Sequence, residues 1–287
     1  MSELGSRAPH PASRPLVVKL GGRALEAPGA LAECAAALRE VAASRPTLVV
    51  HGGGAEVSTW CERAGLLPRF ADGLRVTDAA TLEIAAAVLA GLANKRLVAA
   101  LRAAPIGQDR PGLDAVGLSV LDGGTVRARR HANAAVLGEV GEVASVDETL
   151  VLELLQRGCV PVLASLGDDG HGALLNLNAD DVAAAMAAAF PASDLVLLSD
   201  APGVVLEGEV VRSLSLGALE ETLARPDVTG GMRPKLRAAA VALAAGVGRV
   251  HIAAWQGPHS LAALLDGSAV ATTLHATHDA THEESHA

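Results

Sequence analysis

The stretches LVVKLGG (residues 16–22) and TLVVHGGG (residues 47–54) decide the fold of this chain. Each begins with a short apolar run and ends in glycines, a pattern typical of a buried strand followed by a tight turn. A helical spacing of apolar residues follows each one, over Gly29–Ala43 in the first case and to about Ala64 in the second. Strand, glycine turn and helix in this order, twice in succession, predict a parallel sheet.

The same alternation continues to residue 274 and predicts an α/β fold. We expect further strands at 115–120, 125–129, 159–165, 194–200, 250–253 and 270–274. We expect further helices at 78–103, 150–158, 178–190, 217–224, from 232 onward, and at 260–265. Ser145 and Glu148 have the spacing of a capping box, which predicts the start of the helix before Leu150. Hairpins are expected within 166–177 and around Glu207-Gly208.

Composition and charge indicate a globular protein that does not bind nucleic acid. Half of the 287 residues are apolar and 19% are charged, which excludes disorder as a description of the whole chain. The formal net charge is −9, whereas binding to a phosphate backbone needs clustered Lys and Arg. The basic cluster Arg127–His131 is interpreted as the solvated face of a hairpin.

The cysteines and the ends of the chain predict a cytoplasmic protein that does not enter a membrane. Cys34, Cys61 and Cys159 are scattered and lack metal-site spacing, so neither a disulfide framework nor a zinc site is expected. We find no secretory signal and no charge-free apolar run of about 18 residues. The Pro-rich residues 1–15 predict a flexible arm, and the histidines of 275–287 are interpreted as part of a solvated tail rather than a metal site.

Three glycine turns have a lysine nearby: Lys19 precedes Gly21-Gly22, and Lys235 follows Gly230-Gly231, while Gly52–Gly54 forms the third turn. Glycines at strand ends let backbone N–H groups approach an anion, and a helix N-terminus behind them adds partial positive charge. The alternative is that these glycines merely form tight turns. Neither GxGxxG after a strand nor a P-loop motif occurs, so a phosphate site here would be of another type.

Polar residues at other strand ends complete a candidate site for phosphoryl transfer. Asp180 lies in NLNADD, where Asn178 is the better helix cap, so the carboxylate of Asp180 is free to hold two lysines. Phosphoryl transfer needs mainly positioning and positive charge around the transferred group. Arg75 suits a carboxylate ligand and Asp200 suits a nucleotide, although a surface arginine and a turn-forming aspartate remain alternatives.

Eight strings in this order resemble the amino acid kinase family over residues 16–274. They are VKLGG (18–22), VVHGGG (49–54), DGLRVTD (72–78), LAGLANK (89–95), AVGLS (115–119), NLNADDVAAAMA (176–187), LLSDAPGV (197–204) and TGGMRPKL (229–236). The resemblance implies a three-layer αβα sandwich around a mainly parallel, open sheet of about eight strands, and a homodimer. It also implies an N-terminal lobe, 16–165, for amino acid binding and dimerisation, and a C-terminal lobe, 166–274, for ATP.

The reaction implied by the resemblance is transfer of the γ-phosphoryl group of ATP to the side-chain carboxylate of N-acetyl-L-glutamate, on the route to arginine. The Mg²⁺ would be carried by the nucleotide, with no metal site in the protein. The implied catalytic residues are Lys19, Lys235 and Asp180. The implied substrate-binding residues are Gly22, Gly53, Gly54, Arg75, Asn176 and Asn178. The implied nucleotide-binding residues are Gly21, Asp200, Gly203, Val204 and Thr229.

Two other functions remain open at this point. A related kinase could act on another N-blocked acidic amino acid, such as carrier-protein-linked aminoadipate in lysine biosynthesis. A protein of the same fold could also sense a metabolite without catalysis, although a pure sensor has no need of Lys19, Lys235 and Asp180 together. The acyl group of the substrate also stays open.

The sequence of the Pro-rich residues 1–15 predicts whether arginine inhibits the protein. Family members that arginine inhibits carry an N-terminal helix that links dimers into hexamers, and prolines in residues 1–15 disfavour such a helix. We therefore predict a dimer whose activity is unaltered by millimolar arginine. Strong inhibition together with a hexamer-sized species in solution would contradict this prediction.

Overall fold

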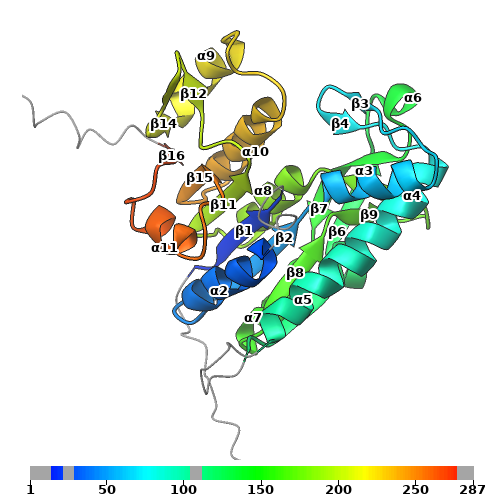
Figure 1. The fold of residues 1–287 in the computed structure, drawn as a ribbon, viewed down its shortest axis with the longest axis horizontal. Helices are drawn as coiled ribbons and strands as arrows, with labels where there is room; N and C mark the ends of the chain where they lie inside the picture. Colours follow the sequence, from blue (N-terminus) through cyan, green and yellow to red (C-terminus); the bar gives the residue numbers. More distant parts are fainter. Residues whose placement is uncertain (1–13, 22–28, 104–111, 277–287) are drawn as a thin grey trace, which may run out of the picture.

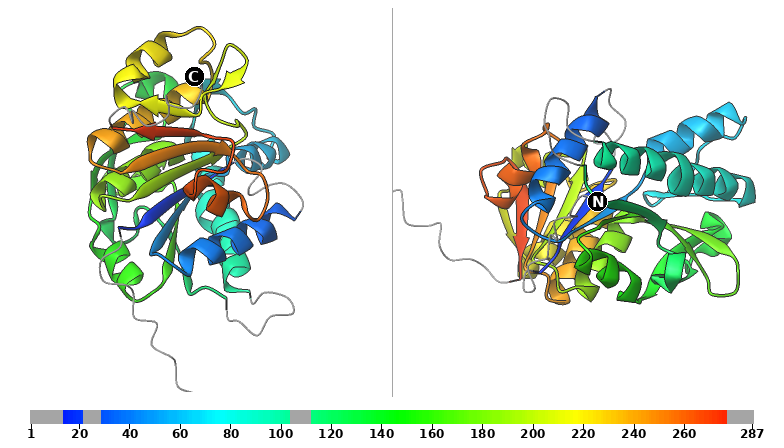
Figure 2. Two further views of the ribbon diagram at one scale, coloured as in Figure 1. Left: turned by 90° about the vertical axis from the view of Figure 1, so that its left-hand side faces the viewer. Right: turned by 90° about the horizontal axis from the view of Figure 1, so that it is seen from below.

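The computed structural model describes residues 14–21, 29–103 and 112–276. They form an eight-stranded open sheet with helices on both faces (Figures 1 and 2). The strand order is β14 (Ser213–Ser215), β16 (Thr272–His275), β15 (Arg249–Ala254), β11 (Asp194–Ser199), β1 (Leu16–Leu20), β2 (Thr47–His51), β8 (Val160–Ala164) and β5 (Ala115–Ser119). The six strands from β15 to β5 are parallel, and β16 runs antiparallel to β15. The predicted three-layer, mainly parallel sheet is confirmed.

The central strands are apolar because both faces of the sheet are covered. All five residues of β1 are buried, and so are those of β2 and β8. Along β1, Val17 packs in the core on one face of the sheet, while Leu16, Val18 and Leu20 pack in the core on the other face. Successive strand residues point to opposite faces, so both layers of helices need apolar partners from the same strand.

Each face has its own set of helices. One core includes residues of α7 (Thr149–Gln156), α8 (Ala179–Ala189), α9 (Leu219–Ala224) and α10 (Met232–Ala244). The opposite core includes residues of α2 (Ala30–Ala42), α5 (Asn94–Arg102) and α11 (Ser260–Leu265). These helices lie close to the predicted ranges, and Asn178 caps α8 as predicted. The alanine-rich helices let backbones pack closely on the sheet with little side-chain entropy to lose.

The helix predicted from residue 78 to 103 contains an unpredicted change of geometry. It consists of α4 (Ala79–Ala86), a π-helical segment η1 (Ala87–Ala93), and α5. Asp78 caps its start by accepting a hydrogen bond from the Thr81 N–H. This helix is long and apolar enough to cross a membrane by length and composition, a criterion that core helices of soluble proteins also meet. It packs against α2, α3 (Gly54–Arg63) and the strands β5 and β8, which accounts for its buried apolar residues, while others, such as Leu92, are exposed.

Four shorter strands form a small closed sheet beside the main one. They are β6 (Val126–Arg130), β7 (Val140–Val146), β9 (Leu166–Asp168) and β10 (Leu174–Leu177). The predicted hairpin within 166–177 is β9–β10, and it pairs with β6 and β7 rather than with the later strands. The remaining elements are the hairpins β3 (Phe70–Ala71)–β4 (Leu74–Arg75) and β12 (Val205–Leu206)–β13 (Glu209–Val210), the helix α6 (Ala134–Leu137), and the 3₁₀ turns η2 (Asp122–Gly124) and η3 (Leu216–Ala218).

The predicted capping box is wrong. Ser145 lies in β7, and the residue that precedes α7 is Glu148, which makes no side-chain cap. The Thr149 N–H at the start of this helix instead donates to Asp147 Oδ1 at 3.0 Å. Pairing of β7 with β6 takes Ser145 into the sheet, and that pairing could not be read from the local spacing.

A buried ion network ties together the amino-terminal ends of the strands. Asp194, at the start of β11, is 2% exposed and accepts from Arg45 Nη1 at 2.9 Å, Arg249 Nε at 2.8 Å and His251 Nε2 at 3.2 Å. Burial opposes ionisation of this carboxyl, but the His251 hydrogen bond and the Arg249 charge outweigh it and hold the pKa of Asp194 well below its usual range. The network joins β11 to β15 and to the turn before β2.

We predict that Asp194→Asn destabilises the protein by about 3 kcal/mol at pH 7, because the partner charges lose their counter-charge. The folded-state pKa is below the unfolded value of about 3.9, so this stabilisation is present above that pH and is lost as the pH falls further. Urea unfolding at pH 7 and pH 3 measures it. A difference between wild type and variant that is as large at pH 3 as at pH 7 would contradict the account.

Candidate functional site

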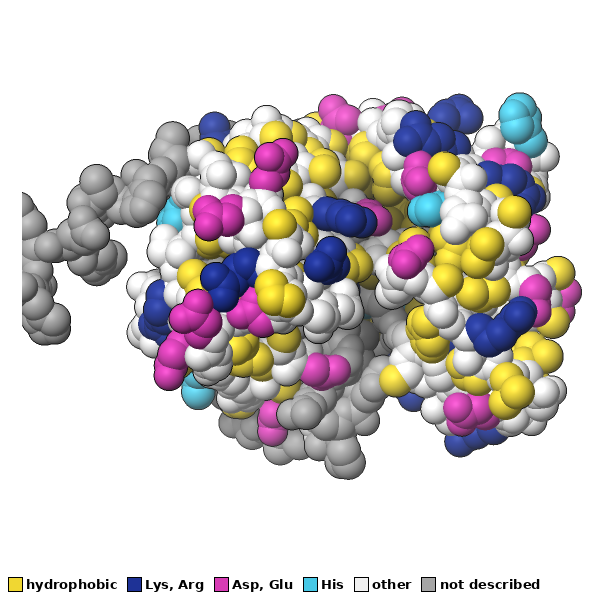
Figure 3. Space-filling view, turned by 90° about the horizontal axis from the view of Figure 1, so that it is seen from above, with side chains coloured by type: hydrophobic (Ala, Val, Ile, Leu, Met, Phe, Trp, Pro, Cys, Tyr) yellow, Lys and Arg dark blue, Asp and Glu magenta, His cyan; other side chains and the backbone are white. Residues whose placement is uncertain are grey.

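A cavity of about 270 Å³ opens where β1, β2 and β10 meet the start of α8. The space-filling view shows the molecule hollowed between its two halves, with Lys and Arg side chains beside the hollow (Figure 3). Residues predicted from sequence that line the cavity are Lys19, Gly53, Gly54, Arg75, Asn176, Asn178 and Asp180. The carboxyl ends of parallel strands therefore form the site, as in other open α/β sheets.

Asp180 joins two lysines that are far apart in the sequence. Lys19 Nζ on β1 lies 2.9 Å from Asp180 Oδ1, and Lys235 Nζ on α10 lies 3.0 Å from Asp180 Oδ2. The side chains of Lys19 and Lys235 are 10% and 12% exposed. Burial opposes ionisation of Asp180, but the two ammonium groups outweigh it and hold its pKa below the usual value. The carboxylate thus stays charged and holds both lysines at one place.

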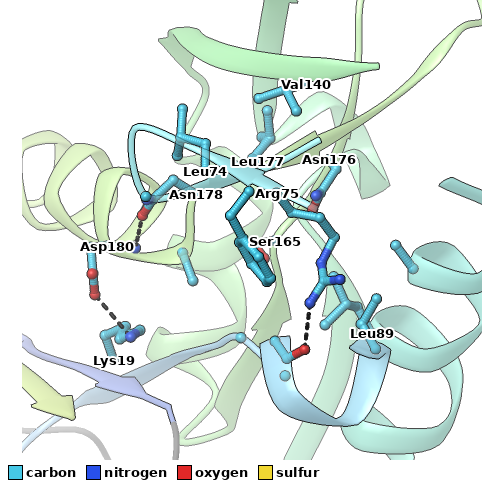
Figure 4. A pocket seen from close by; sticks show the side chains of 18 residues that line it. Lys19, Leu74, Arg75, Leu89, Val140, Ser165, Asn176, Leu177, Asn178 and Asp180 are labelled. Carbon is cyan, nitrogen blue, oxygen red and sulfur yellow. Dashed lines mark hydrogen bonds and ion pairs between the residues drawn. The ribbon is translucent and has the colours of Figure 1, made fainter. Parts of the chain in front are cut away.

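The local sequence explains why the carboxylate of Asp180 is available. Asn178 Oδ1 accepts hydrogen bonds from the N–H groups of Asp180 at 2.8 Å and Asp181 at 3.3 Å. The amide side chain therefore caps α8, and the Asp180 carboxylate is free to face the lysines. Figure 4 shows Lys19 and Asp180 on one side of the cavity and Arg75 on the other.

One terminal nitrogen of Arg75, Nη2, donates hydrogen bonds within the protein, and the other, Nη1, has no partner among the described residues. Its Nη2 donates to Gly54 O at 2.6 Å and to Ser58 Oγ at 2.7 Å, and its guanidinium stands over the Phe70 ring at 4.8 Å. Its Nη1 is buried and has no hydrogen-bond partner among the residues that the structure describes. An unpaired buried donor is costly, and a carboxylate is the ligand that a guanidinium fork binds best. The geometry fits an acidic ligand in the cavity.

Two helices that carry residues of this region begin without side-chain caps. Gly53 precedes α3 and Gly231 precedes α10, and neither position has a capping side chain. Uncapped N-termini leave backbone N–H groups available to an anion and add partial positive charge. Asn176, on β10, donates from Nδ2 to Thr77 Oγ1 at 3.1 Å, which fixes the orientation of its amide beside the cavity.

The five predicted nucleotide-binding residues lie outside the cavity lining. Gly21 follows β1, and a Cβ there would stand 2.7 Å from Lys19 Nζ. Asp200 is exposed after β11, and Thr229 is exposed before α10. Gly203 leaves no room for a Cβ beside Thr272, while Val204 is buried and its N–H donates to Thr272 Oγ1 at 2.8 Å. Packing against Thr272 is therefore a structural reason for both of these residues. The predicted substrate-binding residue Gly22 lies outside the described residues.

Sequence reasoning missed most of the cavity wall. The residues not anticipated are Val57, Phe70, Gly73, Leu74, Ala85, Leu89, Val140, Ser165, Leu177 and Ala179. Gly52, which also lines the cavity, was predicted only as part of the glycine turn Gly52–Gly54. The apolar members resemble ordinary core residues in sequence, and only the fold brings them to one surface.

The family model for the amino acid kinase family matches residues 14–254. The chain therefore belongs to the amino acid kinase family, and the kinase class implies that it uses ATP.

Curated relatives carry a more particular name. The chain is 44% identical over 246 residues to acetylglutamate kinase of Chloroflexus aurantiacus, covering 85% of this chain and 93% of that one. It is 43% identical over 239 residues to acetylglutamate kinase of Koribacter versatilis, covering 83% and 89%. Among solved structures, N-acetylglutamate synthase from Neisseria gonorrhoeae superimposes with a TM-score of 0.80 at 26% identity, covering 92% of this chain and 62% of that one.

We predict that Asp180→Asn lowers ATP-dependent turnover by about 10²-fold, because Lys19 and Lys235 lose the carboxylate that positions them. The matched control is Asp181→Asn, which removes a neighbouring exposed carboxylate on the same helix turn and should leave turnover within about twofold. Steady-state kinetics of the two variants measure this. Equal effects of the two substitutions would show that Asp180 has no special role.

Proposed function

We propose that this protein transfers the γ-phosphoryl group of ATP to the side-chain carboxylate of N-acetyl-L-glutamate, forming an acyl phosphate in arginine biosynthesis. The observation that supports the proposal best is the pairing of two lysines with buried Asp180. The cavity beside them is also lined by Arg75, whose Nη1 has no hydrogen-bond partner among the described residues. The relatives named acetylglutamate kinase, which match most of the chain, support the choice of substrate.

The proposed chemistry is a direct displacement. A carboxylate oxygen of the substrate forms a bond to the γ-phosphorus as the bond from that phosphorus to the leaving oxygen of ADP breaks, and the electron pair stays on ADP. The attacking carboxylate is already ionised at neutral pH, so no general base is required. Lys19 and Lys235 would neutralise the charge on the transferred group, and their positioning by Asp180 is what the protein contributes to the rate.

We assign the acyl amino acid to the cavity and the nucleotide to the neighbouring strand ends. Arg75 Nη1 would bind the α-carboxylate, with Asn176 and Asn178 beside it, and Gly53 and Gly54 would donate N–H groups toward the reacting atoms. Gly21, Asp200 and Thr229 lie around the ends of β1 and β11 and the start of α10, where an uncapped helix terminus suits phosphates. Gly203 and Val204 would shape this turn through Thr272.

A magnesium ion fits this arrangement as part of the nucleotide. Mg²⁺ takes oxygen ligands and is held largely by substrate phosphates in phosphoryl-transfer sites. Asp180 is committed to two lysines, and the described residues hold no group of three or more His, Cys, Asp or Glu that could form a metal cage. When bound, the ion would offset charge on the β- and γ-phosphates, while Lys19 and Lys235 would act from the protein side.

The strand pairing supports a division of the molecule into two lobes. We propose that residues 16–165 form the amino acid side of the molecule and that the nucleotide side lies within 166–274. The strands β9 and β10 belong physically with the first group, because they pair with β6 and β7 and supply Asn176 to the cavity. The nucleotide side would then begin at α8.

We also propose a homodimer in the cytoplasm. The helix from Ala79 to Arg102 is strongly apolar, yet only 33% of its most apolar window is buried, and Leu92 is 43% exposed. An exposed apolar stripe of this kind is typical of a protein contact surface. Light scattering should give twice the mass of the chain, and a monomer mass would contradict the dimer.

The alternative substrates are less favoured by the surface. A kinase acting on an acidic carrier protein would need an exposed basic patch, but Arg129 pairs with Glu142 and Arg130 with Glu139 on the β6–β7 surface. A metabolite sensor would not need two lysines assembled on a carboxylate.

The experiment that tests the proposed function is hydroxylamine trapping of acyl phosphate formed with MgATP. N-acetyl-L-glutamate should be turned over in preference to N-succinyl-L-glutamate, N-acetyl-L-aspartate and free L-glutamate. No product from any of the four, with ATP binding intact, would favour the carrier-linked or the sensor function instead.

We predict that Arg75→Lys raises the KM for N-acetyl-L-glutamate by about tenfold to a hundredfold while the KM for ATP stays near wild type. Lysine keeps the charge but loses the planar fork, whose Nη1 is buried and has no partner among the described residues, and hydrogen bonds to charged groups contribute about 1.5–3 kcal/mol. Steady-state kinetics with each substrate varied separately measure both constants. An unchanged KM for N-acetyl-L-glutamate would remove Arg75 from the substrate site.

A further inference from the structure

A buried histidine stands directly before the glycine turn of the site and has no role in the chemistry above. His51 is the last residue of β2, is 0% exposed, and is followed by Gly52–Gly54. Its Nδ1 lies 2.9 Å from Gly52 O, and its Nε2 lies 3.1 Å from Asn94 Nδ2. Asn94 is also 0% exposed, so both side chains belong to one buried polar network.

The surroundings of Asn94 determine which way its amide points. Its Nδ2 lies 3.2 Å from Leu118 O and 2.9 Å from Val162 O, two carbonyls that require a donor. Its Oδ1 accepts from Lys95 Nζ at 3.1 Å, and a side chain on Gly117 would overlap this oxygen. The amide nitrogen therefore faces all three neighbours and has two hydrogens for them, so one N–H is shared between His51 Nε2 and a carbonyl. Because an amide nitrogen does not accept hydrogen bonds, His51 Nε2 can meet it only as an acceptor.

The orientation of Asn94 in turn determines the tautomer of His51. Since Nε2 accepts a hydrogen bond from Asn94, the ring proton sits on Nδ1, where it donates to Gly52 O. Burial lowers the pKa of His51, consistent with a neutral ring in this network. One carbonyl of the glycine turn is thus held by a side chain whose proton position is itself determined by the fold.

Holding the Gly52 carbonyl also orients the next N–H group. The peptide bond is planar and trans, so the C=O of Gly52 and the N–H of Gly53 point in opposite directions. The bond from His51 therefore turns the Gly53 N–H away from the histidine. Within the described part of the chain, the N–H groups of Gly53 and Gly54 have no acceptor in the protein. Both glycines line the cavity.

The π-helical segment brings the partner of His51 into reach. The Asn94 N–H donates to Leu89 O, a bond between residues five apart. In an α-helix, residues five apart would stand about 140° apart around the axis, whereas π-helical geometry stacks them nearly on one side. Leu89 consequently packs on the glycine turn, where a Cβ on Gly53 would stand 3.0 Å from its Cδ2, while Asn94 meets His51.

From these contacts we propose that His51 and Asn94, brought together by the π-helical turn Ala87–Ala93, are positioning residues that aim the Gly53 and Gly54 N–H groups at the phosphoryl group being transferred. This inference rests on the proposed function. The pair touches no reacting atom and acts through the glycine turn. Its loss should therefore reduce kcat far more than it changes the KM for N-acetyl-L-glutamate.

The test compares three replacements of His51. His51→Leu removes both hydrogen bonds, and His51→Gln places its amide near the Nε2 position, so that it reaches Asn94 but not Gly52 O. His51→Asn places its amide N–H near the Nδ1 position and restores the bond to Gly52 O. We expect kcat to fall about 10²-fold in the Leu and Gln variants and to recover to within about tenfold of wild type in the Asn variant, with the KM for N-acetyl-L-glutamate within about threefold throughout.

The matched control is His251→Asn. His251 is also buried, on a parallel strand of the same sheet, but it contacts Asp194 at the opposite edge. The His251→Asn substitution should lower the melting temperature and leave kcat within about twofold of the wild-type value. Wild-type kcat in the Gln variant, or equal losses in the Asn and Gln variants, would overturn the proposal. If the Leu variant does not fold, the comparison of kcat between the Asn and Gln variants still tests the proposal. A wild-type protein that forms no acyl phosphate would instead overturn the proposed function, whatever the variants show.

Discussion

The site depends on one buried carboxylate that holds two ammonium groups. Asp180 is 5% exposed and contacts Lys19 and Lys235, which come from β1 and α10. Burying three charges is tolerated because each lysine faces the carboxylate and because the carboxylate has oxygens for both. The group still carries a net positive charge, and Arg75 adds another across the cavity. A protein with a formal net charge of −9 can thereby attract a polyanion to one place.

The amino-terminal and carboxyl-terminal ends of the parallel strands differ in how their polar groups are paired. At the amino-terminal edge, Asp194 is saturated by Arg45, Arg249 and His251, so this network holds strands together and leaves nothing for a ligand. At the carboxyl-terminal edge, Arg75 Nη1 lacks a partner among the described residues, and two helix N-termini are uncapped. Polar groups left unsatisfied by the fold are the ones that a ligand can satisfy. The contrast distinguishes a stabilising network from the candidate binding site within one sheet.

Much of the fold was predictable because its strands are continuous apolar runs and its helices are long and periodic. The strands β7 and β14 and the hairpin β3–β4 were not predicted, since short strands depend on pairing that local sequence does not encode. The predicted cap at Ser145 was wrong for the same reason, because Ser145 lies in one of these strands, β7. The π-helical turn was also missed, because its sequence, AVLAGLA, is compatible with an ordinary α-helix.

The candidate site was predictable to the extent that its chemistry is unusual for its position. Lys19 in an apolar strand and Asp180 after a better cap both stood out, and the structure brings them together. Val57, Leu89 and Leu177 could not be distinguished from core residues. For Gly203 and Val204, the structure supplies a packing reason that sequence spacing could not reveal.

The most direct test of the account is a crystal structure with a non-hydrolysable ATP analogue and N-acetyl-L-glutamate bound together. We expect the γ-phosphate between Lys19 Nζ and Lys235 Nζ, the side-chain carboxylate of the substrate facing it, and the α-carboxylate on Arg75 Nη1. A γ-phosphate that contacts neither lysine, or an amino acid bound outside the cavity beside Asp180, would contradict it.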